Sequence, residues 1–168
     1  MDKLFQYYKH LYDFDNWPKY DNSKWNSLKP FSLQLDKEDK FQRISQSVLS
    51  AMWGESLYTH REILRKDDIE FHVTIYPYHT VEKAKNGMLL RMIASIPFEK
   101  TEDITISDLC FIHLGMPNSF LLFLCGSTMI EISTLNGRGH MDDIKELAKL
   151  ITGQMKDVRS RLPRYGSE

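Results

Sequence analysis

This chain of 168 residues has few cysteines, almost no net charge and no long apolar run. Two cysteines cannot build a disulfide framework. The 22 basic and 23 acidic residues leave a net charge of −1, so no strong field attracts nucleic acid or an anionic membrane. The longest apolar run, residues 120–125, is far shorter than the roughly 20 residues of a membrane-spanning helix. We therefore expect a globular protein that neither binds nucleic acid nor spans a membrane.

Sequence motifs with an established chemistry are also missing. No HExxH, CxxC, GxSxG or GxxxxGK[ST] pattern occurs in the chain. Cys110 and Cys125 lie in predicted buried strands, where desolvation suppresses the thiolate, and a hairpin would set them opposite each other. The glycine loop at residues 136–140 precedes a helix, but Asp142 and Asp143 place negative charge where a bound phosphate would sit. We interpret that loop as a turn.

The composition is that of one globular domain, with 42% hydrophobic and 27% charged residues. We expect a single domain over residues 1–168, long enough to bury ~70% of its unfolded surface. It divides into an N-terminal helix and arm at 1–40, an α+β core at 41–160 and a frayed tail at 161–168. The N-terminus has no signal-peptide apolar core, so we expect a cytoplasmic protein, with a removed leader peptide as the open alternative.

Four segments carry apolar residues at the spacing of an amphipathic helix. They are residues 1–12, 41–53, 80–93 and 141–158. Thr80 is suited to cap the third helix, because its side-chain oxygen can accept a hydrogen bond from a free N–H in the first turn.

Five further segments have the patterns of β-strands. They are residues 57–64, 69–76, 109–114, 119–125 and 128–134. Residues 65–68 connect the first two as a hairpin, and 119–125 is apolar on both faces, which is typical of a central strand. We predict an α+β fold: an antiparallel sheet of about five strands with helices packed on one face, in the order helix, arm, helix, β-β-α, β-β-β-α. One core is expected to contain Phe71, Val73, Ile75, Phe120, Leu122, Ile144, Leu147 and Ile151.

The hairpin carries the only constellation that suggests a metal site. If the apolar residues of both strands face the core, His60 falls opposite or diagonal to His72 on the other face. Glu62 and Glu70 then lie beside them, and two histidines with two glutamates could hold a divalent metal. The pattern favours the alternative, a solvated or helix-covered polar face, so we expect neither a metal nor another cofactor.

Residues 13–40, the arm, combine many polar residues with large aromatic side chains. Nine of the chain's 20 aromatic residues lie within residues 1–31. Large aromatics usually serve burial, so we expect most of them to anchor the arm to the core and at least one to remain partly exposed. The arm is also the best candidate for a partner-binding surface, and its interface candidates are Trp17, Tyr20, Trp25 and Phe31.

Three hypotheses for the function remain open, and the sequence favours a protein that is not an enzyme. The first is a small domain that binds another protein of unknown identity, of the inhibitor, immunity-protein or secretion-chaperone type, with a homodimer as a further option. The second is a small-ligand-binding or sensor domain, with a pocket lined by Tyr76, Tyr78, Met88 and Met92. The third is a hydrolase that uses His60 or His72 with a neighbouring glutamate.

Overall fold

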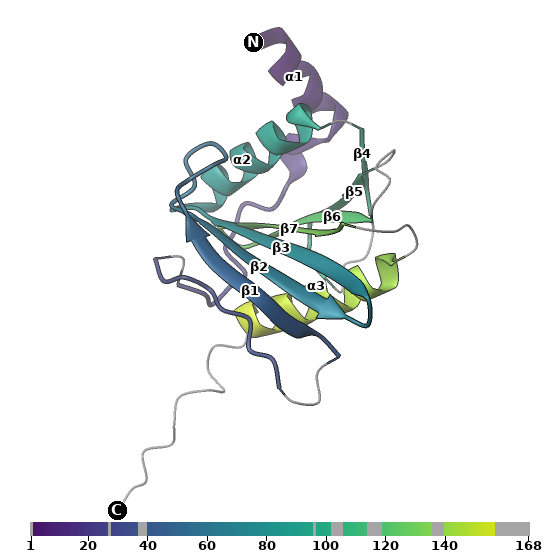
Figure 1. The fold of residues 1–168 in the computed structure, drawn as a ribbon. Coiled ribbons are helices and arrows are strands. Elements are labelled where there is room, and N and C mark those ends of the chain that lie inside the picture. Colours follow the sequence, from purple (N-terminus) through teal and green to yellow (C-terminus); the bar gives the residue numbers. More distant parts are fainter. Residues whose placement is uncertain are drawn as a thin grey trace, which may run out of the picture.

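The computed structural model describes residues 2–26, 28–36, 40–95, 97–101, 106–113, 119–135 and 140–156. Within these residues the chain has an α+β fold, with three α-helices and one antiparallel sheet of seven strands (Figure 1). The predicted fold class is therefore confirmed, although the sheet has more strands than expected. The predicted tail at 161–168 and most of the glycine loop lie outside the described residues.

The helices and strands follow one another in this order: α1 (Asp2–Leu11), a 3-10 helix (Phe14–Asn16), β1 (Gln42–Leu49), β2 (Thr59–Lys66), β3 (Ile69–Pro77), α2 (Val81–Ala94), β4 (Phe98–Lys100), β5 (Cys110–His113), β6 (Phe120–Cys125), β7 (Thr128–Thr134) and α3 (Met141–Lys156). The sheet order is β1-β2-β3-β7-β6-β5-β4. Two meanders thus meet where β3 pairs with β7, and β1 and β4 form the outer edges.

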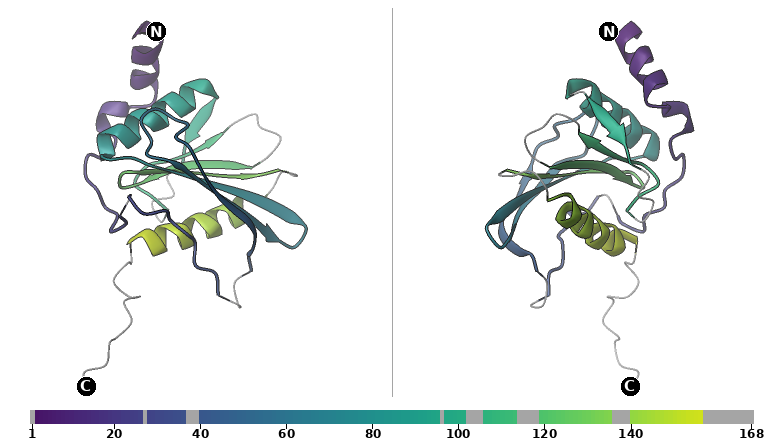
Figure 2. Two further views of the ribbon diagram at one scale, coloured as in Figure 1. Left: turned by 60° about the vertical axis from the view of Figure 1, so that its left-hand side comes forward. Right: turned by 90° about the vertical axis from the view of Figure 1, so that its right-hand side faces the viewer.

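Helices cover both faces of the sheet, so the prediction of helices on one face was wrong. Figure 2 shows α2 and α3 on opposite sides of the strands. One buried cluster joins α3 to the sheet and includes Phe71 and Leu147, whereas the other joins α2 to the sheet and includes Leu122. Strand β6 is buried at all six positions, because its alternate residues point into the two clusters.

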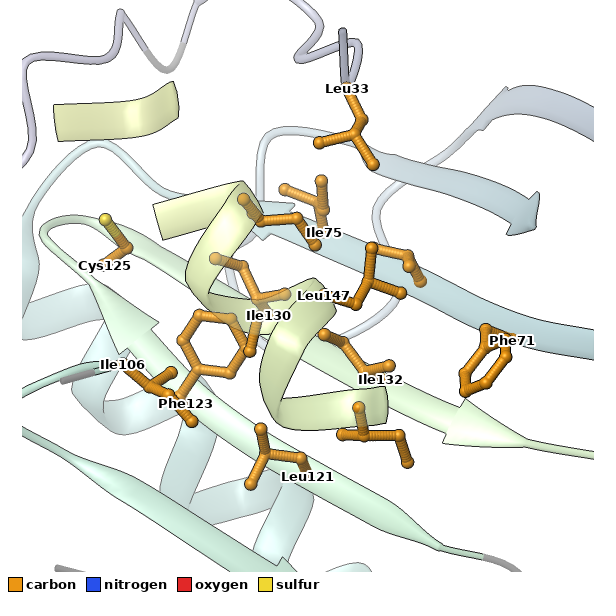
Figure 3. Close-up of a cluster of buried hydrophobic side chains, with 14 of the residues drawn as sticks. Leu33, Phe71, Ile75, Ile106, Leu121, Phe123, Cys125, Ile130, Ile132 and Leu147 are labelled. Carbon is orange, nitrogen blue, oxygen red and sulfur yellow. The ribbon is translucent and has the colours of Figure 1, made fainter. Parts of the chain in front are cut away.

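The predicted single core therefore divides in two. Phe71, Val73, Ile75, Ile144, Leu147 and Ile151 belong to the cluster under α3. Phe120 and Leu122 belong to the cluster under α2. Their neighbours Leu121 and Phe123 point to the α3 side, together with Leu147 (Figure 3). A strand that is apolar on both faces gives no sign of which residues lie on which side, and this explains the error.

Two strands lie in segments that were predicted otherwise. Residues 41–53 were expected to be helical, but residues 42–49 form β1 and pair with β2. Every residue of β1 is exposed, so its apolar spacing does not mark a core-facing helical stripe. Its β-branched Ile44 and Val48 and its two serines favour a strand over a helix. The short edge strand β4 lies between the predicted helix at 80–93 and the predicted strand at 109–114, where no strand was expected.

Candidate functional site

The two histidines of the hairpin lie on opposite faces of the sheet, so the predicted shared face was wrong. His60 pairs with Ile75 and Ile63 pairs with His72, so even positions of β2 share a face with odd positions of β3. The cause is the turn, in which Lys66 pairs directly with Ile69 across only two residues. This register differs from the predicted one by an odd number of residues, which moves every side chain to the other face.

The predicted set of metal-ligand candidates is therefore separated. His60 and Glu62 are buried on the α3 side, beside Val73, whereas His72 and Glu70 lie on the other face. Burial, together with the nearby Arg61 charge, lowers the pKa of His72. In the part of the chain that the structure describes, no three metal-binding side chains come together.

Glu62, which was predicted to lie on the face away from the core, is the centre of a buried polar cluster. Its side chain is 1% exposed. It accepts hydrogen bonds from His60 Nε2 at 3.0 Å, Arg43 Nε at 2.9 Å and the backbone N–H of Leu33 at 3.0 Å. Burial alone would raise the pKa of Glu62, but these three hydrogen bonds outweigh it and hold that pKa below its ordinary value. The cluster thus fastens the arm, through Leu33, to β1 and β2.

The geometry of this cluster suits positioning better than proton transfer. A general base must reach the proton that it abstracts, and the His60 side chain is 0% exposed, with Nε2 already bonded to Glu62. The predicted pairing of the two cysteines is also corrected, since Cys110 pairs with Phe123 instead of Cys125. Burial raises the pKa of the Cys125 thiol to about 12, so this side chain is not an activated nucleophile.

The arm crosses from one face of the sheet to the other. Its first half places Trp17 against Phe111 in the α2-side cluster, with ring centroids 5.6 Å apart. Its second half places Phe31 in the α3-side cluster, 5.0 Å from the Trp25 ring. Trp17 and Phe31 are each 2% exposed, and Trp25 is partly buried, which confirms that most arm aromatics are anchors.

Between these anchors, the arm binds the turn that joins β6 to β7. Asn22 Oδ1 accepts a hydrogen bond from the Gly126 N–H at 2.9 Å, and a side chain at Gly126 would collide with Asp21. Tyr20 is 61% exposed, yet its hydroxyl donates to Asp108 at 2.7 Å. Of the four predicted interface candidates, Tyr20 is thus the one with a mostly exposed ring.

The most accessible apolar side chains of the strands lie at the β1 edge, which the sequence reasoning missed. Ile44 is 46% exposed, Val48 52% and Leu49 40%, and Met52 just beyond the strand is 54% exposed. No strand neighbours the outer side of β1 in the described sheet. The signal that could have identified it is compositional, namely the β-branched and serine-rich sequence of residues 42–49.

A second apolar surface belongs to α1, which projects beyond α2 in Figure 1. Leu4, Tyr7 and Leu11 are each more than half exposed. Next to them lies a groove of about 360 Å³, lined by Leu11, Tyr12, Asp13, Phe98, Glu99, Lys100 and Phe111. A smaller groove of about 310 Å³ lies at α2 and is lined by Gly54, Glu55, Lys83, Asn86, Gly87 and Leu90.

The pocket predicted between the sheet and α2 is filled by its own side chains. Tyr76, Tyr78, Met88 and Met92 are all at most 3% exposed and belong to one buried cluster. The Tyr78 hydroxyl donates to the Trp53 carbonyl at 2.9 Å, which fixes the ring in place. These residues are therefore core, and a small-ligand site would have to lie elsewhere.

Comparison with family models, with curated proteins and with solved structures finds no match for this chain. No helix among the described residues has both the length and the apolar character that crossing a membrane requires.

Proposed function

We propose that the protein is a non-catalytic protein-binding domain that engages its partner through the edge strand β1. The observation that carries this proposal is an eight-residue edge strand that is exposed along its whole length and has apolar residues at Ile44, Val48 and Leu49. Inhibitors, immunity proteins and secretion chaperones are the classes of binding protein that fit such a domain. The cytoplasm is the compartment that we expect.

An edge strand presents unpaired backbone N–H and C=O groups, and natural proteins usually protect them with lysine, proline or a bulge. Strand β1 contains neither lysine nor proline. Its pairing with β2 is irregular between Arg43 and Ser45, so one bulge protects the first part of the strand. Residues 45–49 pair regularly and offer about 17 Å of strand for an added partner strand.

The chemistry of β1 indicates a partner segment that is extended and largely uncharged. The only charged residue of the strand is Arg43, and its guanidinium is already bonded to Glu62. Val48 and Leu49 point to opposite faces of the sheet, so an added strand would contact apolar surface on both sides.

The test compares proteins captured by the wild-type chain and by two variants, Val48→Lys and Leu49→Lys, in cells that naturally contain it. A lysine on the edge should abolish binding by strand addition without unfolding the domain, because both positions are exposed. Leu90→Lys, at a residue 40% exposed on α2, is the matched control and should retain every partner. A partner that binds all three variants alike would show that β1 is not the interface.

A further inference from the structure

Residues 31–35, the strap, form the part of the arm that lies against the α3-side core. Their sequence is Phe-Ser-Leu-Gln-Leu, and they belong to no helix or strand. Phe31 and Leu33 are buried, Ser32 is partly buried and Gln34 is exposed, which is the alternation of an extended segment on a surface. Figure 3 shows Leu33 in the same cluster as Ile75 and Leu147.

Side chains from three different elements recognise the backbone of the strap. The Leu33 N–H donates to Glu62 on β2, and the Leu33 carbonyl accepts from Arg43 on β1. The next residue is bound in the same manner by α3. The Gln34 N–H donates to Gln154 Oε1 at 2.9 Å, and Gln154 Nε2 donates to the Gln34 carbonyl at 2.8 Å. Both backbone polar groups of two successive residues are thus satisfied by side chains.

This arrangement is the one by which grooves recognise extended peptides. Backbone hydrogen bonds supply affinity that is independent of sequence, and pockets for alternate side chains supply specificity. None of these four backbone bonds belongs to a ladder between strands, so the strap can leave without breaking any pairing of the sheet. A segment that paired with β1 as a strand could not leave without breaking hydrogen bonds of the sheet.

The polar atoms beneath the strap provide a second observation. Placing an ionised Glu62 inside a core is strongly unfavourable unless its partners are well arranged, and one of its three partners is the strap itself. His60 is 0% exposed, and its Nδ1 atom has no hydrogen-bond partner among the described residues. The buried Leu33 N–H needs an acceptor in any contact with the core, but a permanent contact gives no use to the unpaired His60 Nδ1.

We propose that the surface formed by β1, β2 and α3 beneath the strap is a peptide-binding site. The strap occupies this site in cis, and an extended segment of another protein with apolar residues at alternate positions replaces it in trans. The preferred ligand pattern follows the strap, namely an aromatic residue followed by leucine at every second position. The site uses the α3 face and does not depend on the outer edge of β1, so it can be present whether or not β1 binds a partner.

The test uses the full-length chain with Phe31→Ser and Leu33→Ser to release the strap, and a fluorescein-labelled peptide with the sequence of residues 29–36. Circular dichroism confirms that the double variant is folded. Fluorescence anisotropy should show at least tenfold tighter binding of the peptide to the released variant than to the wild type. Adding Gln154→Ala, which removes two hydrogen bonds, should weaken that binding about tenfold. A folded released variant that binds no peptide, or binds it equally with Gln154→Ala, overturns the proposal.

Hydrogen exchange in the wild-type protein keeps the proposal testable if the double variant does not fold. The amides of Leu33 and Gln34 should exchange through a local opening, at least tenfold faster than the amide of Val73 in the central strand β3. Their rates should also be insensitive to low denaturant concentrations. Exchange of Leu33 and Gln34 only by global unfolding, together with Val73, would show that the strap is a permanent part of the core.

Discussion

Replacing Gly87 by alanine should destabilise the protein, although alanine is the better helix former. Gly87 lies within α2, where that helix passes over Tyr78. A Cβ atom at this position would lie 2.1 Å from Tyr78 Oη and 2.5 Å from Tyr78 Cζ, which is far inside van der Waals contact. The ring has nowhere to move, because Tyr78 is 0% exposed and its hydroxyl is bonded to the Trp53 carbonyl. Glycine is therefore required here by the close approach of a buried ring.

The expected magnitude follows from three contributions to the free energy of unfolding. Alanine in a helix interior gains roughly 0.8–1.0 kcal/mol over glycine. Overpacking a filled core costs about 1–3 kcal/mol. Displacing the Tyr78 hydroxyl from the Trp53 carbonyl adds about 0.5–1.5 kcal/mol. The net result is a loss of about 1–3 kcal/mol, which lowers the melting temperature by roughly 3–10 °C for a chain of this size.

Thermal and urea unfolding of Gly87→Ala and Gly153→Ala provide a matched comparison. Gly153 also lies inside a helix, α3, but it is exposed and a Cβ there would meet no atom within 4 Å. Gly153→Ala should therefore stabilise the protein by up to about 1 kcal/mol. The cost of Gly87→Ala should shrink in a Tyr78→Phe background, since the nearest atom is then absent. Equal stabilisation by both alanine variants would refute the packing of α2 on Tyr78.

Three further outcomes follow from the buried residues. Leu147→Ala should cost about 2–5 kcal/mol in urea unfolding, because Leu147 is 0% exposed in the α3-side core, and a loss below 1 kcal/mol would contradict that position. The pKa of Glu62 is held below its ordinary 4.5, so the stability that this carboxylate contributes is complete above that pH and is lost as the pH falls through the lowered value. Melting curves between pH 6 and pH 2 should thus fall less steeply for Glu62→Gln than for the wild type. Cys110 and Cys125 are buried, so neither should react with a thiol reagent in the folded protein at pH 8, whereas both should react in denaturant.

The sequence predicts best the segments whose pattern has only one physical interpretation. The last helix is an example, since α3 begins at Met141 as expected and buries Ile144, Leu147 and Ile151. Helix α2 is another, because the Thr80 side chain accepts a hydrogen bond from the Lys83 N–H at its start. Residues 41–53 show the limit. Their apolar spacing fits a helix, but spacing alone does not show whether any surface is available to cover that stripe.

The candidate sites depend on register and on long-range contact, which local patterns do not specify. His60 and His72 lie on opposite faces instead of the predicted shared face, because the hairpin turn has two residues. The groove around the strap joins Gln34 to Gln154, which are 120 residues apart in the sequence. Its one local signal was the alternation of Phe31, Leu33 and Leu35, which is typical of an extended segment with one buried face. The elements that form that groove could only be identified from the fold.

The arm contributes side chains to both buried clusters of the sheet. It contributes Trp17 to the α2-side cluster and Phe31 to the α3-side cluster, so loss of either anchor weakens a contact between the arm and one face. The sheet separates the two clusters, and the arm passes from one face of the sheet to the other beside the turn between β6 and β7. There the Gly126 N–H donates a hydrogen bond to Asn22. An arm that served only to join the two faces would still need an acceptor for the buried Leu33 N–H, but a neutral side chain could supply it. The ionised Glu62 beneath Leu33 exceeds that requirement, and a reversible contact is the simplest physical reason for keeping it.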